Sequence, residues 1–139
     1  MLALAAQEAD IVGLQMTSPA GGALAEEPTL RLAETVMEKI TALRRAAGAR
    51  FRDIELSAVA SVIIADHPRG AAEDFARHRG WSGVPADTVL EMPSVFIGSR
   101  DRIVETMQKR RERYGFSYYV VPAGAIEDCA PIVTHLAGR

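Results

Sequence analysis

The feature that most constrains the fold of this chain is an apolar run near its middle. Between Ile54 and Ile64 the sequence first alternates and then reads Val59, Ala60, Ser61, Val62, Ile63 and Ile64. A near-continuous apolar run is typical of a strand that is covered on both faces, as strands of parallel sheets are. The run therefore predicts a parallel sheet in which Val59, Val62 and Ile64 are buried.

Two further strands and several helices accompany this run. The segments Asp10–Leu14 and Phe116–Val121 have the apolar, aromatic and β-branched composition of strands. Because long helices separate the three strands, the strands must run parallel through right-handed crossovers. Leu43 and Val120 are expected in the core, and Ser99 and Gly115 are expected to begin and end one helix. The predicted helices are Leu2–Ala9, Pro28–Ala47, Ala71–His78, Arg100–Tyr114 and Ile126–Leu136.

The number of strands distinguishes this chain from a complete barrel. It has 139 residues, which suit one domain spanning residues 1–139. A closed barrel needs eight strands and about 250 residues, and a flavodoxin-like sheet needs about five strands. Only three strands are predicted. We therefore expect an α/β fold with three parallel strands and flanking helices that is about half of a larger architecture.

The composition excludes several kinds of partner. The formal net charge is −2, so no basic field attracts nucleic acid or a membrane surface. Cys129 is the single cysteine, which excludes an intrachain disulfide and favours a cytoplasmic location. The apolar amino-terminal segment soon meets Glu8 and Asp10, so it predicts a packed helix and no membrane span.

Because the sequence contains no phosphate-binding or metal-binding motif, candidate site residues are chosen by their position at the carboxyl ends of the predicted strands. No glycine-rich phosphate fingerprint occurs, and the scattered histidines predict no metal site. Parallel α/β proteins bind ligands in the loops at the carboxyl ends of their strands. Those loops offer no acid–base pair, so no catalytic or cofactor-binding residue is assigned. The substrate-loop candidates are Gln15, Met16, Thr17 and His67, and a third loop begins at Pro122-Ala123-Gly124.

Several stretches of the sequence resemble a known family. They are LALAAQEADIVGL near the amino terminus, VFIGSRDRIVE, RRERYGFSYYVV and the closing APIVTHLAG. These stretches are similar to the carboxyl-terminal half of the luciferase-like monooxygenases, especially the deazaflavin (F-420) dependent branch. The resemblance implies that this α/β chain is part of a TIM-type (β/α)8 barrel. It would supply the last three parallel strands and their flanking helices, with an irregular insertion after the strand that ends at Ile64.

The same resemblance implies a cofactor, coenzyme F-420 or FMN, which carries the redox chemistry while the protein positions the reactants. In the family the cofactor is held mainly by the first strands and by a Gly-rich loop just before the helix that here starts at Met1. We therefore expect no tight cofactor binding by this chain alone. The loop that begins at Gln15 would border the substrate and the cofactor tail.

Two classes of function remain open. The first is a monooxygenase-like oxidoreductase that acts on a small-molecule substrate. It needs an amino-terminal half, supplied by a separate chain or by the rest of a longer enzyme. The second is a non-catalytic interaction domain or vestigial domain, whose open sheet edges are covered by self-association into a homo-oligomer. The substrate, the redox direction and the choice between F-420 and FMN stay open.

Overall fold

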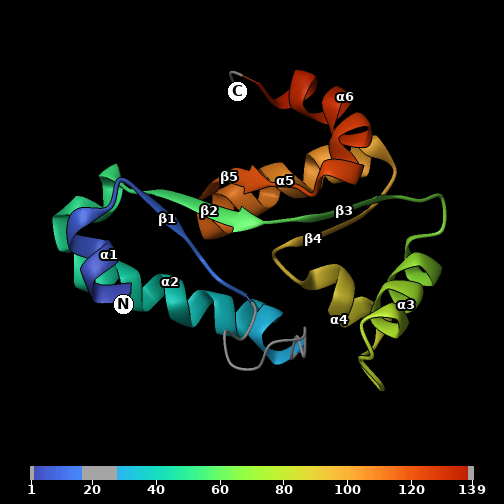
Figure 1. The fold of residues 1–139 in the computed structure, drawn as a ribbon, viewed down its shortest axis with the longest axis horizontal. Helices are drawn as coiled ribbons and strands as arrows, with labels where there is room; N and C mark the ends of the chain where they lie inside the picture. Colours follow the sequence, from blue (N-terminus) through green and yellow to red (C-terminus); the bar gives the residue numbers. More distant parts are fainter. Residues whose placement is uncertain (1, 17–27, 138–139) are drawn as a thin grey trace.

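The computed structural model describes residues 2–16 and 28–137, which alternate between helices and short strands (Figure 1). The described elements are, in chain order, α1 (Leu2–Glu8), β1 (Ile11–Gly13), η1 (Pro28–Arg31), α2 (Ala33–Ala47), η2 (Gly48–Asp53), β2 (Glu55–Val59), β3 (Ser61–Ile64), α3 (Pro68–His78), α4 (Ala86–Glu91), β4 (Val95–Gly98), α5 (Arg100–Tyr114), β5 (Phe116–Val120), η3 (Ala123–Ala125) and α6 (Ile126–Leu136).

The three predicted strands form one parallel sheet in the order β1-β2-β5. Strand β1 pairs with β2 through Val12 and Leu56, and β2 pairs with β5 through Val59 and Val120. Both pairings are parallel, as the helical connections require. The α/β fold with three parallel strands and flanking helices is thus confirmed.

The predicted strand Ile54–Ile64 differs from the observed one, because Ala60 divides it into β2 and β3. The amide of Ala60 still donates to the carbonyl of Val120, at 2.8 Å, so β5 follows the strand to this point. Beyond it, β3 leaves the three-stranded sheet and pairs with β4 in a separate parallel pair. Strand β4 was not predicted. It is only four residues long, too short to show a period of its own.

Helix α2 provides the main packing against one face of the three-stranded sheet. Its buried side chains Val36, Ile40 and Leu43 recur at spacings of three and four, so they lie along one stripe. They belong to one core cluster with the alternate strand residues Val12, Leu56, Ala58 and Phe116 and with Leu14 and Met16, which follow β1.

Helix α5 begins and ends where the sequence predicts. The hydroxyl of Ser99 accepts a hydrogen bond from the amide of Arg102, at 3.3 Å. Gly115 ends the helix with a left-handed φ of 82°, a conformation that costs glycine little. Between these caps, Ile103, Val104 and Met107 pack with Phe96 of β4 and Ile132 of α6 in a separate core cluster.

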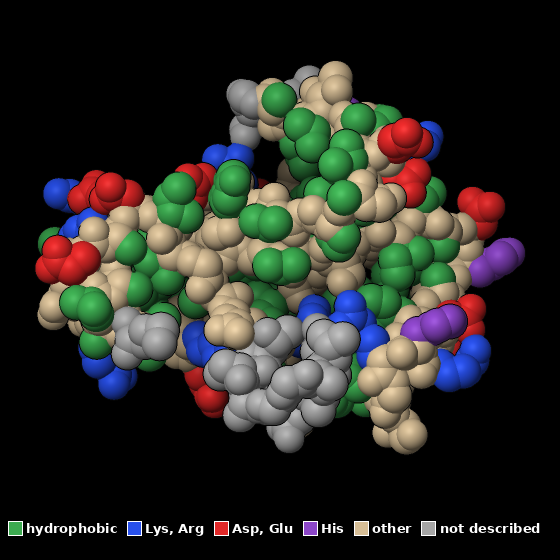
Figure 2. Space-filling model, in the orientation of Figure 1, with side chains coloured by type: hydrophobic (Ala, Val, Ile, Leu, Met, Phe, Trp, Pro, Cys, Tyr) green, Lys and Arg blue, Asp and Glu red, His purple; other side chains and the backbone are tan. Residues whose placement is uncertain are grey.

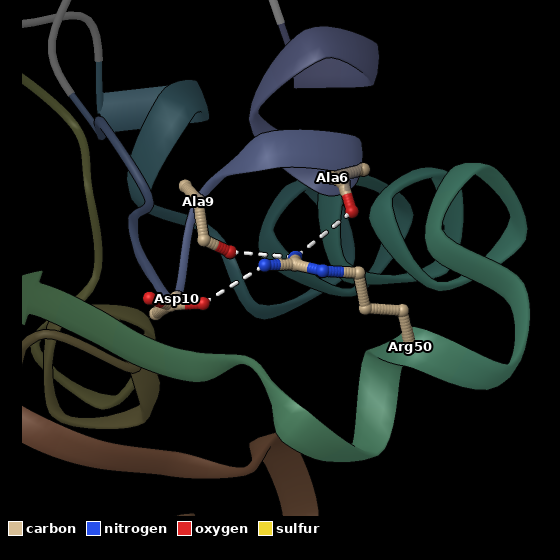
Figure 3. A network of polar contacts seen from close by, with 4 residues as sticks. All are labelled: Ala6, Ala9, Asp10 and Arg50. Atoms are coloured by element: carbon tan, nitrogen blue, oxygen red, sulfur yellow. Dashed lines mark hydrogen bonds and ion pairs between the residues drawn. The ribbon is translucent and has the colours of Figure 1, made fainter.

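Arg50 joins α1 and β1 to the segment that leads into β2 (Figure 3). Its guanidinium donates to the carbonyls of Ala6 and Ala9, at 3.3 and 2.7 Å, and to the Asp10 carboxylate, at 2.9 Å. The carbonyls lie at and just beyond the carboxyl end of α1, where helical carbonyls lack intrahelical partners. This contact helps to fix the angle at which β1 enters the sheet.

The predicted burial of the strand residues is largely wrong. Leu43 is buried, but Val62 and Ile64 are only half-buried, and Val59 and Val120 are 64% and 45% exposed. The physical reason is that α2 covers one face of the sheet, while Val59 and Val120 project from the opposite face. An apolar run does not reveal whether both faces are covered within the same chain.

Candidate functional site

The uncovered face of the three-stranded sheet is the candidate site. Residues paired across a parallel ladder project to the same side, and successive residues alternate. The pairs Ile11 with Glu55, Ser57 with Tyr118 and Val59 with Val120 therefore lie on the face opposite to α2. We call this surface the bare face and define it by Ile11, Gly13, Glu55, Ser57, Val59, Tyr118 and Val120.

The bare face is mainly apolar although much of it is in contact with solvent. Ile11 is 53% exposed, Val59 is 64% exposed and Tyr118 is 50% exposed. The space-filling view shows hydrophobic side chains spread over the middle of the molecule, in the region of β2 and β5 (Figure 2). A cluster of exposed apolar side chains on neighbouring strands marks a surface that contacts a ligand or another protein segment.

The polar groups of the bare face lie toward the amino ends of the strands. Glu55 is the charged residue among its members, and its Oε1 accepts a hydrogen bond from the Ser117 hydroxyl at 2.9 Å. Toward the carboxyl ends, Val59 and Val120 present only hydrocarbon. The arrangement supplies a wall for an uncharged ring or chain, and it contains no pair of groups suited to acid–base catalysis.

The loop after β1 places its candidate residues on different sides of the sheet. Gln15 is exposed, and its carbonyl accepts a hydrogen bond from the Lys39 amine at 2.6 Å. Gln15 also lines a cavity of about 360 Å³ beside β1, together with Leu2 and Ile11. Met16 instead packs in the core cluster beneath α2, and Thr17 lies outside the described residues.

His67 is separated from the edge of the three-stranded sheet. It precedes the first turn of α3 and is exposed. Because β3 continues beyond β2 and pairs with β4, the loop with His67 follows the two-stranded pair, not the sheet that carries the bare face. His67 does not line the cavity that contains Gln15. Gln15 and His67 were predicted in comparable loops because the apolar pattern predicts one strand where the structure has β2 and β3.

The most prominent side chain of the bare face, Tyr118, was not among the predicted candidates. The sequence offers two adjacent tyrosines, Tyr118 and Tyr119, and alternation alone puts one of them on each face. Which tyrosine is exposed depends on the register of β5 against β2. No local pattern in the sequence predicts the register of β5 against β2.

Within residues 2–16 and 28–137, no cluster of histidine, cysteine and acidic residues could hold a metal ion. None of the helices in the same two ranges is long and apolar enough to cross a membrane.

The fold and the bare face define the class of this chain: it is an α/β chain built like part of a TIM-type barrel. A solved structure with a similar fold is the long-chain alkane monooxygenase LadA, with a TM-score of 0.55 and 13% sequence identity. The match covers 97% of this chain and 38% of the LadA chain. At this identity the likeness shows the fold alone, and it supports the luciferase-like fold expected from the sequence. Comparisons with protein-family models and with curated proteins found no match.

Proposed function

We propose that this chain forms one wall of the active site in a luciferase-like, monooxygenase-type oxidoreductase. The observation that carries the proposal is the bare face, an apolar surface on three neighbouring strands of a partial barrel. In a closed barrel of this type the corresponding face points inward, and ligands lie at its carboxyl end. The fold likeness to LadA, a long-chain alkane monooxygenase, supports a fold of this class.

The proposed cofactor is coenzyme F-420 or FMN, and the residues of the bare face fit its ring. Tyr118, Val59 and Val120 offer a flat aromatic group beside hydrocarbon, and no Lys, Arg or His is among the residues that define the face. A phosphate group gains no charge partner from these residues. When bound, such a ring supplies hydride or oxygen chemistry, while this chain holds and orients the reactants and excludes water.

The proposed active form includes strands that this chain does not supply. Strands β1 and β5 are the outer strands of the described three-stranded sheet. A closed barrel of eight strands leaves no open edge. We infer that an amino-terminal half, in the same polypeptide or in a partner, pairs with these edges in the cytoplasm and brings a phosphate-binding loop. The substrate is then a small molecule enclosed between the two parts.

The test is reconstitution of the redox activity. The chain is co-expressed with an amino-terminal half from a luciferase-like protein. NADPH is added as the hydride donor, and its two-electron reduction of F-420 or FMN is followed by absorbance. We expect turnover with both parts together and none with either part alone. A soluble, correctly associated complex that binds and reduces neither cofactor would contradict the proposal.

A non-catalytic, self-associating domain is the second candidate. It is favoured by the same exposed apolar side chains, because a second copy can also cover them. If association of the chain with itself excludes the amino-terminal half, this second function is supported.

A further inference from the structure

The outer edge of β1 presents backbone groups that no described strand uses. The Asp10 carbonyl accepts from β2 and the Leu14 amide donates to β2, both at 2.8 Å. Because alternate residues of a parallel strand bond to the same neighbour, the amides and carbonyls of Ile11 and Gly13 point away from β2. Within residues 2–16 and 28–137, β1 pairs with β2 alone. An edge of this kind is a template for a further strand.

The cavity of about 360 Å³ beside β1 lies along this edge. Leu2 and Ala5 of α1 line it together with Ile11 and Gly13, and Lys39 of α2 lines it as well. We call this place the β1 slot and define it by these five residues. A Cβ added to Gly13 would meet no heavy atom within 4 Å, so the edge is unobstructed there. An unpaired backbone edge beside an apolar wall fits an extended peptide strand.

Lys39 gives one end of the β1 slot a positive charge. Its Nζ donates to the Gln15 carbonyl at 2.6 Å, just beyond the carboxyl end of β1. In the described part of the chain, Lys39 forms no ion pair with a carboxylate. A strand that lies in the slot and carries a carboxylate at this end therefore gains a charge-assisted hydrogen bond.

A second copy of this chain does not fit the β1 slot. Two copies that paired β1 with β1 would be related by a two-fold axis perpendicular to the sheet, so the two strands would run antiparallel. Helix α1 lies on the α2 side of the sheet, where Ala6 belongs to the core cluster of α2, and it lines the slot. The second copy would bring its own α1 to the same side of the same edge. Both helices would then need the same space.

We propose that the β1 slot binds one parallel β-strand from another polypeptide segment. This strand is apolar toward Leu2 and Ala5, and a carboxylate at its carboxyl end pairs with Lys39. The parallel direction continues that of β1, β2 and β5. This inference rests on the proposed function for the source of the strand, the amino-terminal half. The chemistry of the strand rests only on the unpaired edge, the apolar wall and the lysine.

The test attaches one strand to the full chain. A segment of alternating valine and threonine that ends in aspartate is fused ahead of Met1 through a short glycine–serine linker, because Leu2 lines the same cavity as the carboxyl end of β1. The tether gives the strand a millimolar effective concentration. Hydrogen exchange is then followed by NMR. The amides of Ile11 and Gly13 should exchange at least about ten-fold more slowly than in the unaltered chain, whereas Val12, already bonded to β2, should change little.

The direction and the charge of the strand are tested on the same fusion. A nitroxide at the carboxyl end of the added strand should broaden the signals of Gln15 more than those of Asp10, as a parallel strand requires. Replacing the terminal aspartate by asparagine should speed exchange at Gly13 about two- to five-fold, the range of an exposed ion pair. Lys39→Gln should have the same effect and Lys39→Arg should not. The matched control Lys109→Gln, on α5, should leave exchange unchanged.

Three results would overturn the proposal. They are unchanged exchange at Ile11 and Gly13 in the fusion, stronger broadening at Asp10 than at Gln15, and equal exchange with terminal aspartate and asparagine. Protection of the two amides in the unaltered chain that grows with its concentration would show that a second copy occupies the edge, which also overturns it. The fusion needs no cofactor, no turnover and no amino-terminal half. A protected edge together with a failed reconstitution of redox activity would therefore contradict the oxidoreductase function and retain the β1 slot.

Discussion

Arg110 is a buried cation that connects α5 to the segment around β4. Its guanidinium donates to the carbonyls of Leu90, Pro93 and Val95, and it lies 4.6 Å from the centroid of the Phe96 ring. Burial lowers the pKa of Arg110 to about 10, so it remains charged near neutral pH. The Leu90 carbonyl lies near the carboxyl end of α4, where carbonyls lack intrahelical partners, and an N–H group of the planar Arg110 guanidinium donates to it.

Replacing Arg110 by methionine should reduce the free energy of unfolding by at least about 2 kcal/mol, because a buried acceptor left without a donor costs about 1–3 kcal/mol. The neighbouring Lys109→Met, at an exposed position, should change stability by less than about 0.5 kcal/mol. Urea unfolding of both variants gives the comparison. Equal stability of the two variants would show that the carbonyls find other donors.

Tyr119 has a buried hydroxyl for which the described residues provide no hydrogen-bond partner. Burial raises the pKa of Tyr119 to about 12, above its ordinary value of 10.0, although the Arg110 charge opposes the shift. Below pH 10 the folded and unfolded states both keep the phenol proton. Between pH 10 and 12 the unfolded state loses it first, so this group's contribution to stability is lost as the pH rises through the folded pKa.

Tyr119→Phe should therefore leave stability at pH 7 unchanged or raise it by up to about 1 kcal/mol, since only an unpaired hydroxyl is removed. From pH 10 to 12 the unaltered chain should lose more stability than the variant. Arg110 contributes in the opposite direction, and its charge interacts with Tyr119, so the difference between the two proteins reports the removal of the tyrosine together with its effect on Arg110. Parallel pH profiles from thermal unfolding would contradict this account.

At the scale of elements, the two faces of the sheet should respond differently to the same kind of substitution. Leu43→Ala in α2 removes a fully buried side chain and should cost about 2–5 kcal/mol. Val59→Ala on the bare face should cost no more than about 0.5 kcal/mol, because Val59 is 64% exposed. Chemical denaturation at a concentration at which the chain is monomeric measures both. A large loss of stability for Val59→Ala would then mean that another part of the same chain covers the bare face.

The sequence predicts long, strongly periodic elements well. The bounds of α5 and α6 agree with the predictions, because apolar spacing and, for α5, the caps Ser99 and Gly115 are local signals. The face on which Tyr118 lies and the end of β2 at Ala60 depend on pairing with distant strands, which no local pattern encodes. The loops with Gln15 and His67 both follow strands, but the division of β2 and β3 separates His67 from the sheet with Gln15.

At the scale of the whole molecule, the bare face should promote self-association of the isolated chain. Val59→Glu places a charge on this face and should shift the chain toward monomer at micromolar concentration. Leu4→Glu is a matched control, because Leu4 is 65% exposed on α1, away from the sheet face. Sedimentation velocity compares the two variants. A monomeric unaltered chain, or an equal effect of both substitutions, would argue against association through the bare face.

The central claim is that this chain forms one wall of a cofactor site and lacks the rest. The most direct measurement is a titration of F-420 and FMN, followed by fluorescence, against the chain alone and against the chain with an amino-terminal half. We predict weak binding by the chain alone, because a ligand gains affinity only when several fixed groups contact it at once. Binding should become tight and stoichiometric when both parts are present. Tight, stoichiometric binding by the chain alone would contradict the claim, because it would show that this chain contains a complete pocket.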